Sequence, residues 1–219
     1  PTIIGKKTEK EKFAGAEYTY TLEALMYNGV ALQSGTSHYF GQKFARAYDI
    51  KFTNRENKFE YAYQTSWGVS NRMIGALIMV HGDDSGLVLP PRVAPTQVMI
   101  VPIMQKKEGV LEKAAELKDM LKNYRVKVDD SDKNPGFKFA EQEMRGFPLR
   151  VEIGPKDIEK GECVIVRRDT REKISVKIDD VAMEAAKLLD AIHKDMFERA
   201  KKFREEHTYE ASTYEEFKT

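Results

Sequence analysis

The chain has 219 residues, with 36 lysines and arginines against 35 aspartates and glutamates and a formal net charge of +1. This length suits one large domain or two modest ones, and the balanced charge excludes a protein that is uniformly basic for nucleic acid, although it permits a local basic face. No apolar run approaches the roughly 18 residues of a membrane span, the N-terminal segment lacks the apolar region of a signal peptide, and the single cysteine, Cys163, rules out an internal disulfide, so we expect a soluble protein in a reduced, cytoplasmic setting.

The first part of the chain predicts an antiparallel sheet followed by a buried helix. Asn28-Gly29 separates two partly alternating runs, which indicates a hairpin closed by a type I′ turn. The lysine-rich start is predicted to be a solvated loop, with a lid over the active site as the alternative. The expected elements are strands at 18–25, 30–40 and 59–67, a short helix at 42–49, and a buried helix from about Asn71 to Val80.

The glycines and prolines of HGDDSGLVLPPRVAP interrupt regular structure, and we place a domain boundary at the end of this segment, after residue 95. Strands then alternate with helices, which predicts a three-layer α/β domain with a largely parallel sheet at 96–205. The expected strands are 97–103, 124–130, 148–154 and 162–169, and the expected helices are 108–121, 136–144 and 181–206. The last helix carries an apolar stripe of Val181, Ala185, Leu188, Ile192, Met196, Ala200 and Phe203.

A single arginine, Arg72, stands where the aromatic turn SWGVSN meets an almost uncharged helix. A helix start exposes unpaired N–H groups and positive potential, and an arginine there suits a polyphosphate. Gly68 and Gly75 permit the close approach of backbone or ligand, and Trp67 supplies a flat apolar wall. We expect these groups to share one face of a sheet with the polar side chains of QSGTSH, a combination that fits a nucleotide and a small amino acid: Gln33, Thr36 and His38.

The stretch SWGVSNRMIGALIMVHGDDSGLVLPPRVAP resembles motif 3 and its exit loop in class II prolyl-tRNA synthetases. Upstream, GTSHYFGQ is similar to the proline-site strand of the same family, and KKTEKEKFAGAEYTYTLEA resembles its archaeal/eukaryote-like branch. The segment NPGFKFAEQEMRGFPLRVEIGPKDIEKGECVIVRRD resembles the class IIa anticodon-binding domain. The resemblance covers nearly the whole chain, as the C-terminal part of a catalytic domain at 1–95 followed by the anticodon-binding domain at 96–205.

The resemblance implies a proline–tRNA ligase, which uses ATP with Mg²⁺ to convert L-proline to prolyl-adenylate and then transfers the prolyl group to tRNA(Pro). By position, Arg72 is implied to hold the γ-phosphate of ATP as an electrostatic clamp. The remaining implied contacts are Gln33, Thr36 and Ser70 for the nucleotide, and His38, Ser66, Trp67 and Gly68 for proline.

Two departures from the family pattern matter. Motifs 1 and 2 are expected upstream of Pro1, so the isolated chain is predicted to be inactive, and residues 206–219 are expected to lead toward a C-terminal extension. The family implies a homodimeric parent whose interface is built by motif 1, which leaves the oligomeric state of this chain open.

The resemblance also implies anticodon contacts in the second domain. Arginines at the end of an apolar strand suit phosphates or unstacked bases, and a carboxylate can accept hydrogen bonds from guanine. The alternative for RRDTREK, residues 167–173, is a charged hairpin without an RNA contact. The predicted anticodon residues are Arg150, Glu152, Lys156, Arg167 and Arg168.

Several of these residues also have structural interpretations. Arg72 can cap a core helix through a salt bridge, Trp67 can be a core residue, and His38 can be a satisfied sheet histidine. HGDDSG is interpreted as a turn in which aspartates accept backbone amides, rather than a metal site. Cys163 is expected to be an inert core thiol rather than a nucleophile, and His193 is expected to be structural.

Two hypotheses about function stay open at this point. The first is an enzyme, the proline–tRNA ligase of which this chain is part. The second is a non-catalytic tRNA-binding module, or a synthetase-like paralogue that kept the scaffold. Proline-dependent ATP–pyrophosphate exchange separates them.

Overall fold

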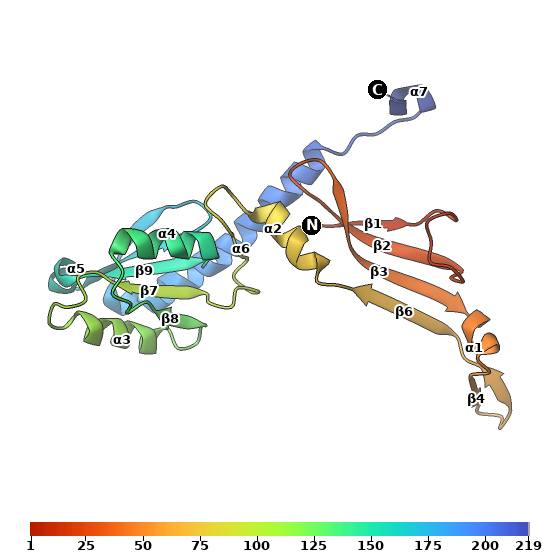
Figure 1. Ribbon diagram of the computed structural model, residues 1–219, viewed down its shortest axis with the longest axis horizontal. Helices are drawn as coiled ribbons and strands as arrows, with labels where there is room; N and C mark the ends of the chain where they lie inside the picture. The colour runs from red at the N-terminus through yellow and green to blue at the C-terminus, as the bar shows by residue number, and fades with distance from the viewer. Residues whose placement is uncertain (219) are drawn as a thin grey trace. The chain divides into compact units, whose positions relative to one another are not determined.

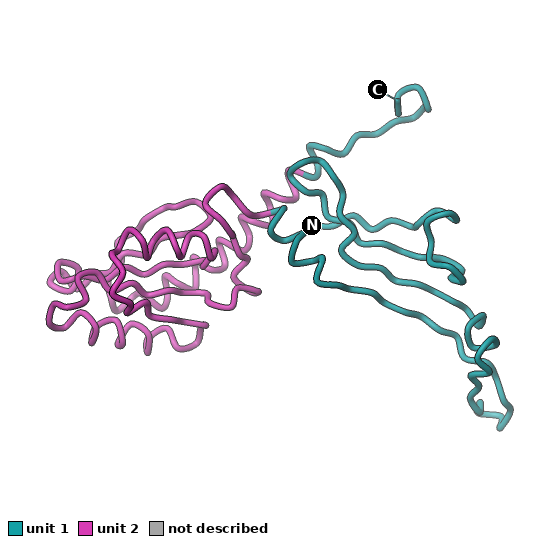
Figure 2. The backbone as a smooth tube through the Cα atoms, viewed as in Figure 1, with its two compact units in different colours: residues 1–80, 204–219 teal, residues 81–203 magenta. Residues whose placement is uncertain are grey.

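A computed structural model describes residues 1–218 of the chain. It divides into two compact units, residues 1–80 with 204–219 and residues 81–203 (Figure 2). Units defined by contacts need not coincide with family domains. The domain limits expected from the sequence, at 95/96 and 205/206, therefore stay predictions.

The first unit is built on a four-stranded antiparallel sheet of order β1-β2-β3-β6 (Figure 1). A separate two-stranded hairpin, β4-β5, lies outside this sheet. The elements are β1 Ile3–Lys6, β2 Tyr18–Leu25, β3 Ala31–Gly41, α1 Lys43–Ala47, β4 Lys51–Thr53, β5 Phe59–Tyr61, β6 Gln64–Val69, α2 Arg72–His81 and α7 Tyr214–Lys218.

Three expectations for this unit need correction. The start of the chain is not a loop throughout, because β1 pairs with β2. The strand expected at 59–67 is two strands, β5 and β6, which pair with different partners. The turn at Asn28-Gly29 is not type I′: only Gly29 has a positive φ, 79°, and its N–H donates to the Met26 carbonyl at 2.9 Å. This is a three-residue hairpin loop that closes with a left-handed glycine.

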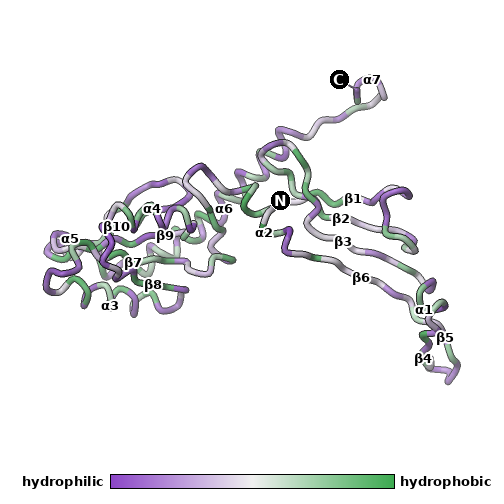
Figure 3. Tube along the Cα trace, in the orientation of Figure 1, coloured by the Kyte–Doolittle hydropathy of each residue, from purple (hydrophilic) through white to green (hydrophobic). Residues whose placement is uncertain are grey.

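Helix α2 forms as expected, but it is not buried. Only Ala76 is buried in α2, whereas Met73, Ile74 and Ile78 are exposed. In Figure 3 the tube at α2 includes hydrophobic colouring. The physical reason is that, among the described residues, no second layer of the first unit covers this helix.

The second unit contains a five-stranded mixed sheet of order β11-β10-β9-β7-β8. Strand β7 pairs in parallel with both β8 and β9, but β10 is antiparallel to β9 and to β11. The expectation of a largely parallel sheet is therefore wrong. The elements are β7 Val98–Pro102, α3 Val110–Met120, β8 Val126–Val128, α4 Pro135–Arg145, β9 Leu149–Ile153, α5 Pro155–Lys160, β10 Glu162–Arg167, β11 Lys173–Lys177, a 3-10 helix Ile178–Asp180 and α6 Val181–Glu206.

The two faces of this sheet are covered by different helices, which confirms the three-layer architecture. Strand residues such as Val98, Ile100 and Ile165 pack with α3 and α6 in one apolar core. Helix α4 lies on the opposite face, where its Phe139 contacts Arg150. In α6, the buried stripe contains Leu189 in place of the expected Leu188.

Candidate functional site

Strand β3 presents Gln33, Thr36 and His38 on one face of the first unit's sheet. His38 pairs with Thr19 and Thr36 pairs with Thr21, so strict alternation would place Gln33 on the other face. A β-bulge at Ser34 resets the register, because Gln33 pairs with Glu23 while Gly35 pairs with Leu22. The bulge brings the three predicted side chains to the same face.

Strand β6 adds Ser66 and Gly68 to that face, since they lie opposite His38 and Thr36. A Cβ atom on Gly68 would lie 3.0 Å from the Thr36 hydroxyl oxygen, so a side chain here would crowd Thr36. At Gly75 nothing lies within 4 Å of the position that a Cβ atom would take, so the described chain does not require a glycine there.

Trp67 lies on the opposite face. It pairs with Ser37, between the pairs made by Ser66 and Gly68, and 79% of its surface is exposed. Both the expectation that Trp67 walls a slot beside His38 and its alternative as a core residue are wrong. The reason is the two-residue period of a strand, which places consecutive side chains on opposite faces.

Arg72 is exposed at the first position of α2. Its backbone N–H donates to the hydroxyl oxygen of Ser70 at 3.3 Å, so Ser70 caps the helix start. Within residues 1–218, the guanidinium makes no ion pair. The alternative in which Arg72 caps a core helix through a salt bridge is therefore wrong, and the positive charge faces solvent.

The segment between β1 and β2 covers the face that carries His38. Lys7 donates to the side-chain carbonyl of Gln33, and the ring of Phe13 lies 5.0 Å from that of His38. Nδ1 of His38 lies 2.9 Å from the Thr19 hydroxyl, which also accepts the N–H of Phe13. This geometry satisfies the hydrogen bonding of His38, and the lid over an active site stays a prediction.

A cavity of about 550 Å³ opens on the same face. Thr21 and Glu23 contribute to it from β2, Gly5 contributes from β1, and Lys7 and Glu11 contribute from the covering segment. Since Thr21 pairs with Thr36 and Glu23 pairs with Gln33, the cavity adjoins the side chains predicted for the nucleotide.

In the second unit, Arg150 and Glu152 form a charged cluster with two residues that the sequence analysis missed. The Arg150 guanidinium lies 4.1 Å from the ring centre of Phe139 and donates to Glu152 at 2.9 Å. The ammonium of Lys173 lies 3.8 Å from Glu152 and 5.8 Å from the Phe139 ring. Lys173 is largely exposed, whereas Arg150 is buried. The sequence signal that could have revealed this cluster was Phe139, the second aromatic residue of NPGFKF.

Arg167 and Arg168 are not free for RNA. Arg167 donates to both carboxylate oxygens of Asp169, at 3.0 and 2.8 Å, and to Asp195 at 2.7 Å. Arg168 makes two bonds to Asp83, at 2.8 and 2.6 Å. Both arginines are buried. The expectation that they bracket phosphates is corrected, because each guanidinium is already neutralised by carboxylates.

Lys156 is exposed in α5, beyond the carboxyl end of β9, whereas Arg150 and Arg168 lie toward the opposite end of that strand. The structure therefore brings Arg150 and Glu152 together but separates Lys156 from the arginine pair. The segment RRDTREK is the turn of an antiparallel hairpin between β10 and β11, as the alternative interpretation expected.

The remaining candidates have structural surroundings. Burial, with a smaller effect of Asp157 and Glu162, raises the pKa of the Cys163 thiol to about 12, which confirms an inert core thiol. In HGDDSG, Asp83 accepts the N–H of Ser85 at 2.9 Å, as a turn predicts. Nδ1 of His193 is buried without a hydrogen-bond partner. Residues 1–218 contain no group of three or more metal-ligating side chains placed to hold an ion.

Comparison with known proteins gives one family model and several similar proteins. Residues 97–188 match the anticodon binding domain family HGTP_anticodon. The chain is 66% identical to a proline–tRNA ligase of Lachnoclostridium phytofermentans over 99% of its length, and 65% and 61% identical to those of Lachnospira eligens and Agathobacter rectalis over its whole length. It covers 46% of each relative, so it spans about half their length. These relatives are bacterial, which leaves the archaeal/eukaryote-like branch a prediction. Residues 97–188 are thus similar to an anticodon binding domain, and the chain is similar throughout its length to proteins named proline–tRNA ligase.

Proposed function

We propose that this chain is part of a proline–tRNA ligase. The identity to proline–tRNA ligases over the whole chain supports the assignment. The structural observation that carries it is the unpaired guanidinium of Arg72 at the start of α2, capped by Ser70. A helix start that carries a free arginine attracts the terminal phosphates of ATP.

The proposed reaction has two steps. The carboxylate of proline attacks the α-phosphorus of ATP, which forms prolyl-adenylate and releases pyrophosphate. The terminal ribose hydroxyl of tRNA(Pro) then takes the prolyl group and AMP leaves. Mg²⁺ would enter with ATP and neutralise phosphate charge. Arg72 holds the γ-phosphate as it leaves with pyrophosphate, and no proton passes through the arginine.

The face that carries His38, Ser66 and Gly68 is the proposed proline pocket. Its small residues leave room for a ring, and the backbone at Gly68 allows close approach. Trp67 is left out of this pocket because it lies on the other face. Gln33, Thr36 and Ser70 are the proposed nucleotide contacts.

The second unit is the proposed anticodon reader. Phe139 and the exposed Lys173 supply a ring and a cation, and the buried Arg150, which is paired with Glu152, lies against the ring of Phe139. Splayed RNA bases are recognised by stacking on rings or guanidinium planes and by hydrogen bonds to their edges. Lys156, which is exposed, is proposed as a further contact to the RNA backbone.

Proline-dependent ATP–pyrophosphate exchange, measured on the protein that carries these 219 residues, tests the assignment. Arg72→Ala is expected to lower the exchange rate by about 10²- to 10³-fold, as removal of a preorganised charge contact does. Arg55→Ala removes an equally exposed arginine in the β4–β5 turn and is expected to leave the rate unchanged.

Exchange that survives Arg72→Ala would contradict the role of the clamp. If the unmutated protein bound tRNA(Pro) but gave no exchange under any condition, the non-catalytic tRNA-binding module would replace the ligase as the better description.

A further inference from the structure

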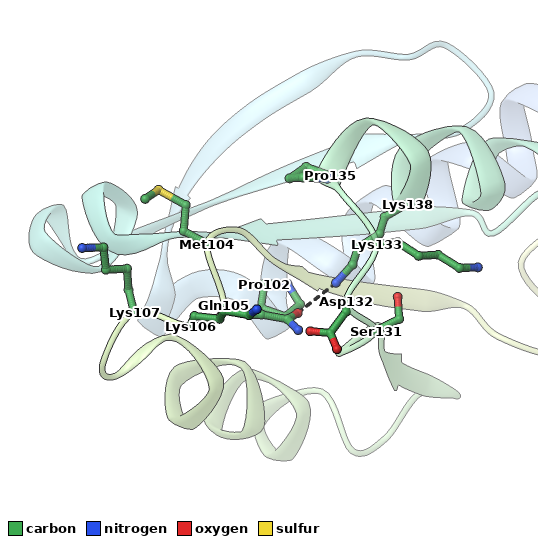
Figure 4. A pocket seen from close by; sticks show the side chains of 10 residues that line it. All are labelled: Pro102, Met104, Gln105, Lys106, Lys107, Ser131, Asp132, Lys133, Pro135 and Lys138. Atoms are coloured by element: carbon green, nitrogen blue, oxygen red, sulfur yellow. Dashed lines mark hydrogen bonds between the residues drawn. The ribbon is translucent and has the colours of Figure 1, made fainter.

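A cavity of about 440 Å³ lies at the carboxyl ends of β7 and β8 in the second unit (Figure 4). Two loops form it: residues 103–109, which lead from β7 to α3, and residues 129–134, which lead from β8 to α4. Its volume lies within the range of small-ligand sites, about 300–1,000 Å³. None of the residues discussed above for ATP, proline or the anticodon lines it.

The topology of the sheet explains why a cavity forms here. Strands β7 and β8 are parallel neighbours, yet the chain leaves β7 toward α3 on one face and leaves β8 toward α4 on the other. Adjacent loops that separate toward opposite faces leave a crevice between them. In open α/β sheets, ligands bind at this switch point, beyond the carboxyl ends of the strands.

The two loops are held together by a buried lysine. Lys138 of α4 is 2% exposed, and its ammonium donates to the Gln105 side chain at 2.9 Å and to the Asp129 carbonyl at 2.7 Å. Gln105 in turn donates to the Asp130 carbonyl at 2.8 Å. These bonds connect one loop to the other, so the cavity is preorganised.

The Asp129 carboxylate is fully engaged in this brace. It accepts from the Ser131 hydroxyl at 2.6 Å and from Gln142 at 3.2 Å. Burial alone would raise the pKa of Asp129, but these hydrogen bonds and the charge of Lys138 outweigh it and hold the pKa below its ordinary value. This carboxylate lies 3.8 Å from the Lys138 ammonium and is not among the residues that line the cavity.

The lining contains both apolar and cationic side chains, of which Met104 is exposed and Lys138 is buried. Pro102, Met104 and Pro135 supply apolar walls, while four lysines line the cavity against a single aspartate, Asp132: Lys106, Lys107, Lys133 and Lys138. Lys133 is already paired with Glu141 at 2.7 Å. Lys106 and Lys107 are exposed, and the described residues give neither an ion pair. Met104 adopts a φ of 54°, a backbone conformation rare for its residue type.

We propose that this cavity binds one nucleotide unit of a single-stranded RNA segment, with the base against the apolar walls and its phosphate at Lys106 and Lys107. This inference rests on the proposed function, because tRNA is the RNA that the second unit is proposed to bind. Exposed lysines at a solvent-facing rim suit a continuing phosphodiester chain. RNA, rather than a free mononucleotide, is therefore the source that the geometry favours.

The test uses the full 219-residue chain and a labelled anticodon stem-loop with a proline anticodon, titrated at several salt concentrations. Lys106→Ala/Lys107→Ala is expected to weaken binding about tenfold near 0.1 M salt. It should also reduce the slope of log K against log salt by about 0.7, because one single-strand phosphate contact is lost. Lys118→Ala/Lys122→Ala removes the same charge outside the cavity and is expected to change neither quantity.

A second variant separates base from phosphate. Met104→Asn keeps a residue that tolerates a positive φ but removes the apolar wall. It is expected to weaken binding of the stem-loop severalfold while the salt slope stays that of the wild type. A slope that falls as in the lysine variant would contradict a base contact at Met104.

Titrations with small ligands distinguish RNA from a free nucleotide or phosphate as the ligand. Adenosine monophosphate and inorganic phosphate, titrated alone, are expected to bind far more weakly than the stem-loop; either of them binding as tightly would overturn the RNA proposal. If the wild type binds the stem-loop and both double variants lose the same amount of affinity, the cavity is not the binding site. That result would overturn this inference but not the proposed tRNA-binding function. A chain that binds no stem-loop at any salt concentration would overturn both this inference and the proposed tRNA-binding function.

Discussion

At the scale of single residues, the pair between Asp83 and Arg168 shows how the second unit fixes its first loop. The side chain of Arg168 is 2% exposed and that of Asp83 is 39% exposed, and Arg168 also donates to the Glu143 carbonyl at 2.8 Å. A buried guanidinium must find acceptors for its donors. Arg168 therefore secures residues 81–86 to the sheet and has no free edge left for RNA.

This pair predicts a pH-dependent stability. Its hydrogen bonds with Arg168 lower the pKa of Asp83 from 3.8 to about 2. A carboxyl with a depressed folded-state pKa stabilises the fold above its ordinary pKa, and this contribution is lost as the pH falls toward 2. Asp83→Asn is expected to lower the free energy of unfolding at pH 7 by about 1–2 kcal/mol, after allowance for the partial exposure of Asp83.

Urea unfolding at pH 7, 4 and 3 measures this difference between the wild type and Asp83→Asn. The difference is expected to persist at pH 7 and to shrink below pH 4. Asp84→Asn is the matched control, because Asp84 is adjacent and exposed and has no ion pair among the described residues. A difference that stays constant down to pH 3 would contradict the pairing.

The sequence predicted single residues well where local rules decide them, and poorly where a distant partner does. Cys163 as a core thiol follows from its immediate neighbours in an apolar strand. The partner of Arg168, by contrast, lies 85 positions away, so no local pattern reveals that its charge is neutralised. Trp67 is different, because alternation along its strand was sufficient to place its side chain on the other face of the sheet from Ser66 and Gly68.

At the scale of elements, helix α4 ends against the loop that carries Leu87. Gly146 closes the helix with a φ of 70°, and its N–H donates to the Gln142 carbonyl at 3.0 Å. A Cβ atom at Gly146 would lie 2.5 Å from the carbonyl oxygen of Leu87. Gly161 closes α5 in the same conformation, with a φ of 67°, but nothing lies within 4 Å of its Cβ position.

These two glycines give a matched pair of variants. Gly161→Ala is expected to cost about 1–2 kcal/mol of unfolding free energy, from backbone strain alone. Gly146→Ala is expected to cost about 3 kcal/mol or more, because the same strain is joined by a clash with the backbone at Leu87. Chemical denaturation of both variants checks the ranking, and equal losses would show that the 86–89 loop does not pack on the end of α4 as described.

Element length explains which helices and strands were predictable. Helices α3, α4 and α6 each span at least 11 residues, so a 3.6-residue period and capping residues are visible in the sequence. Among the missed elements, β1, β4, α5 and β11 have 4, 3, 6 and 5 residues. The antiparallel pairing of β10 was missed because the short α5 does not form the full crossover that a parallel strand requires.

At the scale of the whole molecule, the two units carry the two halves of the proposed task. The first holds the faces proposed for ATP and proline, and the second holds the residues that match an anticodon binding domain and the lysine-lined cavity. No helix within residues 1–218 is long and apolar enough to cross a bilayer. The exposed apolar side chains of α2 were not predictable, because the apolar run itself is typical of a buried helix.

The most direct test of the account is the amino-acid dependence of ATP–pyrophosphate exchange by the protein that carries this sequence, measured with each of the twenty amino acids. The proposed function predicts the highest kcat/KM for proline. Alanine, which lacks the ring methylenes, is expected to be disfavoured by about 10- to 200-fold, as a pocket that discriminates by shape allows. Exchange that is faster with another amino acid than with proline would contradict the account.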